Sequence, residues 1–321
     1  MVPPQINNVF IIRHGERLDH AIKMWRPDPS HGLWDPPLSP AVSYMILGHE
    51  QAEKTGQRLV ELLEEVGVDL ETTSVVIYSS PFQRCIDTSL GIARHVPNSI
   101  LRLELGLGEW MCERFFDEDL APASRLIARQ QEALARQQAQ AFASMATKTK
   151  NNNYSDYLGN TTALTTPVVP MLPWVDYGYR PLRTEFDFPE RYGDMLRRFD
   201  EARMHCLATA QQLPPQKTNK KTTACSSHMI LLFVTHAVGV NALLDGFRNQ
   251  LTRPIETGYC SISRVTRTSH HLPSPIVMFP AASTTTISSA LPSPKEEKDT
   301  SDLHERDEWT VDLLASDTHL T

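Results

Sequence analysis

Short apolar runs alternate with amphipathic segments along the first part of the chain. Residues 9–12 (VFII) and 74–78 (SVVIY) are continuous β-favouring runs, as expected of strands buried on both faces of a parallel sheet. Between them, residues 48–66 carry one apolar stripe at helical spacing and stop at Gly67, which predicts a helix. Pro81 is well placed to open a second helix directly after the second strand.

The same patterns continue to the end of the chain. The further predicted elements are helices at 81–94, 117–147 and 191–213 and strands at 100–103, 229–235, 258–265 and 309–313. Residues 229–235 (MILLFVT) form the most hydrophobic run and predict a central strand. The β-α-β-α-β order favours a parallel or mixed sheet covered by helices, which is an α/β fold.

Composition supports a folded protein with extra segments. The chain has 321 residues, of which 40% are apolar and 21% charged, enough to bury a core and to exclude wholesale disorder. The 23 prolines outnumber the 14 glycines and gather in a few stretches, which indicates irregular insertions. We predict a single domain over 1–321, with insertions at about 117–160 and 273–305. The first of these, because of its polar composition, is expected to be a solvated insertion at the periphery.

Charge and cysteine usage limit the partners and the compartment. The net charge of −7 argues against a nucleic-acid-binding surface, so any anion site has to be a local cluster of positive groups. The five cysteines are scattered, which favours a reducing setting and gives no metal-binding pair. No secretory signal and no apolar run long enough to span a membrane are visible. We therefore expect a soluble protein of the cytoplasm, with the nucleus left open, and no membrane partner.

The densest chemical signal is the segment Arg13-His14-Gly15-Glu16-Arg17 at the end of the first strand. Read alone, it could be a surface loop that merely contains charges. Its position after a buried strand favours an anion site. One guanidinium can bind two phosphate oxygens at once, and glycine lets the backbone come close to the anion. Glu16 is expected to point away from the pocket and pair with a basic group.

Three other residues are weaker candidates when taken singly. Arg84 falls in the first turn of a predicted helix, whose N-terminus itself favours anions. Glu109 lies between glycine and tryptophan, an apolar setting expected to raise its pKa and suit a general acid, although an ordinary loop glutamate is the alternative. His236 follows the most apolar strand, where a satisfied core histidine is the commoner reading.

Together these segments resemble the histidine phosphatase superfamily, also called phosphoglycerate-mutase-like. The resemblance rests on RHGER at 13–17, SSPFQR at 79–84, the GEW segment with Glu109 and VTHA at 234–237, in that order. The DPPLS stretch followed by GHEQA at 48–52 is similar to a further motif of that family.

Two features indicate the branch. Ala237, rather than aspartate, follows His236, and the candidate acid Glu109 lies upstream, which resembles the first branch of the superfamily. Within it, the RHGER ending in Arg17 is similar to the phosphatase domain of the suppressors of T-cell receptor signalling and the ecdysteroid-phosphate phosphatases.

The resemblance implies a fold, a mechanism and a set of roles. The fold would be a three-layer α/β/α sandwich with a mostly parallel central sheet. His14 would attack phosphorus and form a phosphohistidine, while Glu109 acts first as acid and then as base. The implied phosphate-binding residues are Arg13, Arg17, Arg84 and His236. No metal and no cofactor are implied, and the rate profile is expected to be bell-shaped with an optimum on the acidic side of neutral.

The substrate is expected to be a phosphorylated small molecule or a phosphoprotein, with an aryl, protein-tyrosine or steroid phosphate as the options. An aromatic set could stack on such a leaving group or simply pack the loops; it consists of Trp25, Trp34, Trp174, Tyr177 and Tyr179. A homodimer stays open as an assembly.

Two other functions compete. One is a phosphoglycerate-type mutase, against which stands Arg17 in place of the hydroxyl residue usual in mutases. The other is a non-catalytic assembly component resembling the tau subunit of RNA polymerase III initiation factor C. A silent protein has little reason to keep the whole set of candidate groups, so the sequence favours an active phosphatase.

Overall fold

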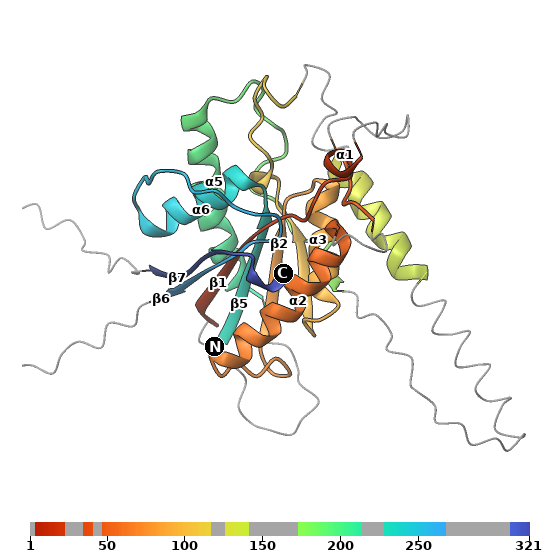
Figure 1. Ribbon diagram of the computed structural model, residues 1–321, viewed down its shortest axis with the longest axis vertical. Helices are drawn as coiled ribbons and strands as arrows, with labels where there is room; N and C mark the ends of the chain where they lie inside the picture. Colours follow the sequence, from red (N-terminus) through yellow and green to blue (C-terminus); the bar gives the residue numbers. More distant parts are fainter. Residues whose placement is uncertain are drawn as a thin grey trace, which may run out of the picture.

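The computed structural model describes residues 4–22, 35–40, 47–116, 126–140, 173–213, 228–267 and 309–321. Within these ranges the strands join one mixed sheet in the order β4-β3-β2-β5-β1-β6-β7 (Figure 1). The strands are β1 (Gln5–Arg13), β2 (Ser74–Ser79), β3 (Ser99–Leu103), β4 (Trp174–Val175), β5 (His228–Thr235), β6 (Ile262–Arg267) and β7 (Trp309–Ser316). The helices are α1 (Leu18–Ala21), α2 (Gly48–Glu65), α3 (Gln83–Ala93), α5 (Tyr192–Ala210) and α6 (Ala237–Arg248), with short 3-10 turns η1 (Leu105–Leu107) and η2 (Thr318–Leu320).

The sheet is parallel through most of its width. β5 lies between β1 and β2 and pairs with both in parallel, and β2-β3 and β3-β4 are parallel as well. The β6 and β7 strands run antiparallel at the other edge. The predicted central position of residues 229–235 is therefore confirmed, and so is the mostly parallel sheet.

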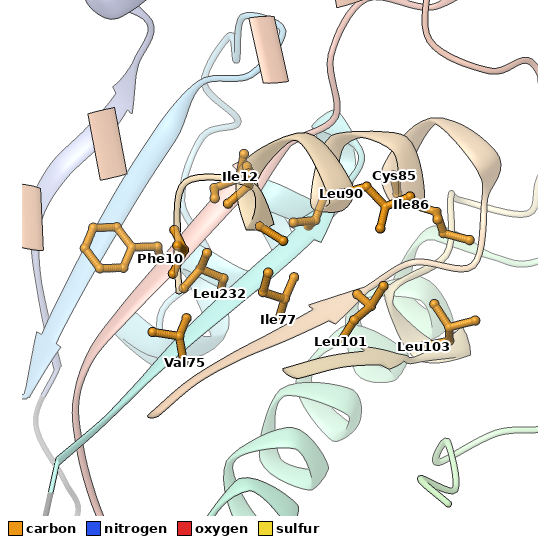
Figure 2. Packing of buried hydrophobic residues seen from close by; sticks show 14 of the residues in the cluster. Phe10, Ile12, Val75, Ile77, Cys85, Ile86, Leu90, Leu101, Leu103 and Leu232 are labelled. Atoms are coloured by element: carbon orange, nitrogen blue, oxygen red, sulfur yellow. The ribbon is translucent and has the colours of Figure 1, made fainter. Parts of the chain in front are cut away.

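Helices cover both faces of this sheet, as the alternation of side chains along each strand requires. On β1, Phe10 and Ile12 face the layer formed by α2 and α3, where they pack with β2, β5 and α3 side chains (Figure 2). Val9 and Ile11 of the same strand face α5 and α6. The α/β class with three layers is confirmed.

Most of the predicted elements lie where the sequence places them, and three differences have local causes. β6 begins at Ile262 rather than at residue 258, because Cys260 has a left-handed backbone (φ 53°) that interrupts the extended chain. β4 is a strand of two residues inside a stretch expected to be irregular, and it exists because β3 offers it an edge. The α6 helix, which follows His236, was not predicted at all.

Residues 126–140 of the first predicted insertion pack against the core on one side, whereas its polar stretch at 148–160, on which the expectation of a solvated insertion rests, lies outside the described residues. Residues 126–140 are helical, within the predicted 117–147 segment, and their apolar face is buried. Leu126 and Leu134 are 2% and 3% exposed and belong to the core layer of α2 and α3. The predicted insertion at 273–305 lies outside the described residues, and the single-domain organisation stays a prediction.

The described helices include none that is both long and apolar enough to cross a bilayer. Four of the cysteines are described, and they are buried and free: Cys85, Cys112, Cys206 and Cys260.

Candidate active site

Two histidines lie side by side at the carboxyl ends of β1 and β5. His14 directly follows β1, and its backbone N–H donates to the Thr235 carbonyl of β5 at 2.9 Å. His236 follows Thr235 and forms the N-cap of α6. The two ring centroids are 5.3 Å apart. The parallel pairing of β1 with β5 thus brings together two residues that are distant in the sequence.

The contacts of the His14 ring define its tautomer. Nδ1 lies 2.7 Å from the carbonyl oxygen of Gly15, which can only accept, so Nδ1 carries the proton. Nε2 receives the Nε–H of Arg84 at 3.2 Å and therefore holds a lone pair. Burial lowers the pKa of His14 well below 6.5, and the charges of Arg84 and Arg13 lower it further. His14 is a neutral imidazole whose Nε2 can act as a nucleophile.

Arg84 is the central contact of the cluster. It lies in the first turn of α3, its side chain is 1% exposed, and Nη2 is 3.0 Å from Nδ1 of His236 and 3.5 Å from Oε2 of Glu109. Its Nη1 is buried and has no hydrogen-bond partner among the described residues. A buried guanidinium donor of this kind is a ready partner for the oxygen of an anion.

His236 is held from both of its ring nitrogens. Nε2 lies 3.0 Å from the hydroxyl oxygen of Ser80, and Nδ1 lies 3.0 Å from Nη2 of Arg84, with Oε2 of Glu109 beside it at 3.3 Å. Burial lowers the pKa of His236 well below 6.5, followed by the charge of Arg84, so the ring is neutral here. A dianion bound next to the ring would favour its protonated form.

The carboxylate of Glu109 reaches the same cluster from the segment that follows η1. It is not in the apolar setting that the sequence led us to expect, because it lies beside the Arg84 guanidinium and the His236 imidazole. Its side chain is 16% exposed, so one side of it is open to a substrate or to water. This position suits a group that passes protons to and from a bound ester.

Arg13 approaches the cluster from β1. Its Nη1 donates to the carbonyl oxygen of Thr257 at 2.6 Å, and its guanidinium carbon lies 4.1 Å from the ring centroid of Tyr259. Its Nε is buried and without a hydrogen-bond partner in the described ranges. The Tyr259 ring also lies 5.8 Å from the His14 ring, so an aromatic side chain flanks the candidate nucleophile.

Arg17 is oriented differently from Arg13 and Arg84. Its Nε and Nη2 donate to the two carboxylate oxygens of Asp19, at 3.0 and 2.7 Å. Its charge still acts on the site, since it contributes to lowering the pKa of both His14 and His236. The structure therefore brings Arg17 within electrostatic range of the site, where its Asp19 contact competes with an anion.

Gly15 and Gly48 let two backbone segments touch behind the site. A Cβ atom on Gly15 would lie 2.7 Å from the carbonyl oxygen of Gly48, and one on Gly48 would lie 2.3 Å from that of Glu16. The sequence led us to expect that Gly15 lets the backbone come close to an anion. The close approach seen in the structure is to the start of α2. The Glu16 carboxylate accepts a hydrogen bond from the Ser39 hydroxyl at 3.5 Å.

The charge balance of this cluster favours an anion over a cation. Burial lowers the pKa of both Arg13 and Arg84, and repulsion from Arg17 acts in the same direction on both. Guanidiniums remain charged even so, and Glu109 is the carboxylate that acts on both of them, with Asp35 acting on Arg84 as well. The described residues contain no group of three or more histidine, cysteine, aspartate or glutamate side chains able to hold a metal ion.

Three supporting residues were given no role from the sequence. Ser80, Thr257 and Tyr259 contact His236 or Arg13. Ser80 lies within the SSPFQR motif and Tyr259 opens the YCSIS segment, which also resembles the phosphatase group, whereas Thr257 lies in neither. Of the proposed aromatic wall, Tyr179 is a packing residue, because it is 8% exposed and donates to the buried Glu104. Trp174 is 63% exposed at the sheet edge, and Trp25 and Trp34 lie outside the described residues.

Comparison with known proteins gives distant structural likenesses. No family model and no curated protein matches the chain. Among solved structures, the ecdysone phosphate phosphatase of Bombix mori is 16% identical with a TM-score of 0.45, covering 89% of this chain and 98% of its own. The phosphoglycerate mutase of Bacillus anthracis is 12% identical with a TM-score of 0.45, covering 99% and 97%. A mycobacterial glucosyl-3-phosphoglycerate phosphatase is 12% identical with a TM-score of 0.42, covering 97% and 99%.

Proposed function

We propose that this chain is a phosphomonoester hydrolase of the histidine phosphatase type, acting through a phosphohistidine on His14. The observation that carries the proposal is the contact between the lone pair on Nε2 of His14 and the fully buried Arg84, whose Nη1 has no partner among the described residues. Attack on a phosphoryl group requires a neutral nucleophile, and next to it a guanidinium with an N–H group free to bind a phosphoryl oxygen.

In the first half-reaction, Nε2 of His14 forms a bond to phosphorus as the bond from phosphorus to the ester oxygen breaks. Nδ1–H of His14 stays on the Gly15 carbonyl, which stabilises the charge that develops on the ring. Glu109, in its protonated form, gives its proton to the departing oxygen. Arg84 turns from His14 to the phosphoryl oxygens, which it binds together with Arg13, Arg17 and His236.

In the second half-reaction, Glu109 as a carboxylate takes a proton from water while the water oxygen attacks phosphorus. The bond between phosphorus and Nε2 breaks, inorganic phosphate leaves, and both groups return to their starting forms. Positioning and charge neutralisation by fixed protein groups provide most of the acceleration in this type of transfer.

For the substrate we propose an aryl ester, either a small phenolic phosphate or a phosphotyrosine side chain, with a steroid phosphate as the second option. The support is the Tyr259 ring, which flanks His14 and is itself fixed by Arg13, so that it can stack on an aromatic leaving group. A panel of phosphotyrosine peptides, steroid phosphates, sugar phosphates and phosphoglycerates would rank these options. Highest kcat/KM on a sugar phosphate or a phosphoglycerate would contradict the aryl preference.

The covalent mechanism is tested with the variant His14→Ala and a small aryl phosphate. We expect the variant to lose hydrolysis, and the wild-type chain to yield an acid-labile phosphoenzyme when it is quenched during turnover. Wild-type hydrolysis by the variant, or a phosphoenzyme stable in acid, would rule out His14 as the nucleophile.

A further inference from the structure

Arg198 of α5 uses every N–H group of its guanidinium, on one carboxylate and three backbone carbonyl groups. Nε and Nη2 donate to the two carboxylate oxygens of Glu190, at 2.7 and 2.8 Å. Nη1 donates to the carbonyl oxygens of Gly106 (2.7 Å) and Gly108 (3.1 Å), and Nη2 also donates to that of Glu109 (3.1 Å). One side chain therefore holds three backbone carbonyls in the segment that leads up to Glu109.

Glu190 makes further hydrogen bonds to the residues that follow Glu109. Its carboxylate Oε2 accepts the backbone N–H of Met111 at 3.3 Å, and its own N–H donates to the Met111 carbonyl at 2.7 Å. Its carbonyl oxygen accepts the indole N–H of Trp110 at 2.9 Å. Residues on both sides of Glu109 are thus fixed to the same ion pair.

The ion pair is fully buried, with side chains 5% and 2% exposed for Arg198 and Glu190. Such a pair contributes little net stability, because desolvation of the charges offsets their attraction. Its effect is instead to fix the orientation of the segment that carries Glu109. The Glu109 backbone is pinned from the α5 side, while its carboxylate points to the other side, 3.3 Å from His236 and 3.5 Å from Arg84.

We propose that Arg198, together with Glu190, is the positioning element of the general acid Glu109. This inference rests on the proposed phosphatase function. Arg198 does not touch the reacting atoms; it fixes the distance between the Glu109 carboxyl and the departing oxygen. A planar fork with five donors is needed for this, so a lysine keeps the charge without keeping the geometry.

The experiment compares two substrates in the variant Arg198→Lys. The first, para-nitrophenyl phosphate, has a leaving group that departs without a proton, and the second, an alkyl phosphate, needs one. We expect kcat to fall about 100-fold on the alkyl ester but only a few-fold on the aryl ester, since general-acid assistance is worth roughly 10²–10⁴. KM should change little on either substrate. Equal losses of kcat on the two esters would overturn the inference.

A double-mutant cycle with Glu109→Gln identifies the partner. If Arg198 acts through Glu109, Arg198→Lys should add almost no further discrimination between the esters once Glu109→Gln is present. Fully multiplicative losses would mean that Arg198 acts elsewhere. Arg197→Lys, one position away in α5 and 67% exposed, is the matched control and should leave both rates unchanged.

Two further measurements keep the outcome clear. If Arg198→Lys does not fold, as judged by thermal unfolding, Glu190→Gln serves in its place with the same expected split between esters. If the wild-type chain hydrolyses neither ester, the proposed function fails; if it hydrolyses both and the variants lose both equally, only the positioning role fails.

Discussion

The Nε–H of Arg84 donates to Nε2 of His14 at 3.2 Å, so a buried guanidinium occupies the lone pair of the candidate nucleophile. A phosphoryl group can reach His14 only if this hydrogen bond is exchanged for bonds to its oxygens. The exchange is favourable, because a charge-assisted hydrogen bond to phosphate is stronger than one to neutral imidazole. Arg84 would therefore hydrogen-bond to His14 when the site is empty, and to the phosphoryl oxygens when substrate is bound.

The first prediction tests this dual role with Arg84→Lys. The lysine keeps one positive charge but cannot serve several acceptors in one plane, so we expect kcat/KM on an aryl phosphate to fall by about 10²- to 10³-fold. Steady-state kinetics measure the loss. Arg94→Lys, at an exposed arginine paired with Glu53, is the control and should behave as wild type. A change of less than about threefold in Arg84→Lys would contradict a phosphate-binding role.

The second prediction concerns pH and the two buried histidines. Their folded pKa values lie well below 6.5, chiefly because of burial, whereas in the unfolded chain they ionise near 6.5. Between these values the unfolded state binds more protons. The stability from neutral His14 and His236 is thus fully present above about pH 6.5 and falls as the pH drops below it, by up to about 1.4 kcal/mol per pH unit for each ring.

Urea unfolding at a series of pH values measures this slope. The double variant His14→Asn/His236→Asn should show a shallower decline on the acid side than the wild type, since each substitution removes one linked proton. Parallel pH profiles for the two proteins would show that folding does not shift the pKa of either histidine, which would contradict their neutral, buried state.

Local sequence patterns predict the strands and motif residues of this site, whereas the residues that hold them in place are brought there by tertiary contacts. The apolar runs that form β1 and β5 and the motif residues His14 and His236 could be identified because each rests on neighbours in sequence. The α6 helix was missed because its apolar start continues the run of β5 without a turn signal.

The supporting residues carry no local signal at all. Arg198 looks like any polar residue of an amphipathic helix, and only the folded chain shows that it faces three carbonyls. The same applies to Glu109, whose flanking glycine and tryptophan indicated an apolar setting, whereas Arg84 and His236 come from other elements to surround it.

The third prediction concerns Asp35, which connects the 126–140 helix to α3. Its Oδ1 accepts the N–H of Gln83 at 2.7 Å, which caps the helix turn that carries Arg84, and its Oδ2 pairs with Arg129. Asp35→Ala removes a buried cap and leaves Arg129 without its partner. We expect a loss of about 1–3 kcal/mol in the free energy of unfolding, with a higher KM because Arg84 is less well placed.

Arg129→Gln should shift stability and KM in the same direction as Asp35→Ala, since the buried Asp35 carboxylate loses its ion pair. Arg136→Gln changes a 66% exposed residue of the same helix and is the control. If KM is unchanged in both Asp35→Ala and Arg129→Gln, the 126–140 helix has only a packing role.

The fourth prediction concerns the contact between the His14 segment and the start of α2. In Gly48→Ala the new Cβ would lie 2.3 Å from the carbonyl oxygen of Glu16, a backbone atom that cannot move without displacing the residues around His14. We expect stability to fall by about 1–3 kcal/mol and kcat to fall with it, because overpacking shifts the backbone that orients the nucleophile. Gly193→Ala in α5 is the matched control, since a Cβ there meets nothing within 4 Å and should be neutral or slightly stabilising in denaturant unfolding. Wild-type kcat in Gly48→Ala would show that the segment carrying His14 tolerates displacement. The Gly15 carbonyl and Arg84 would then be enough to orient the His14 ring.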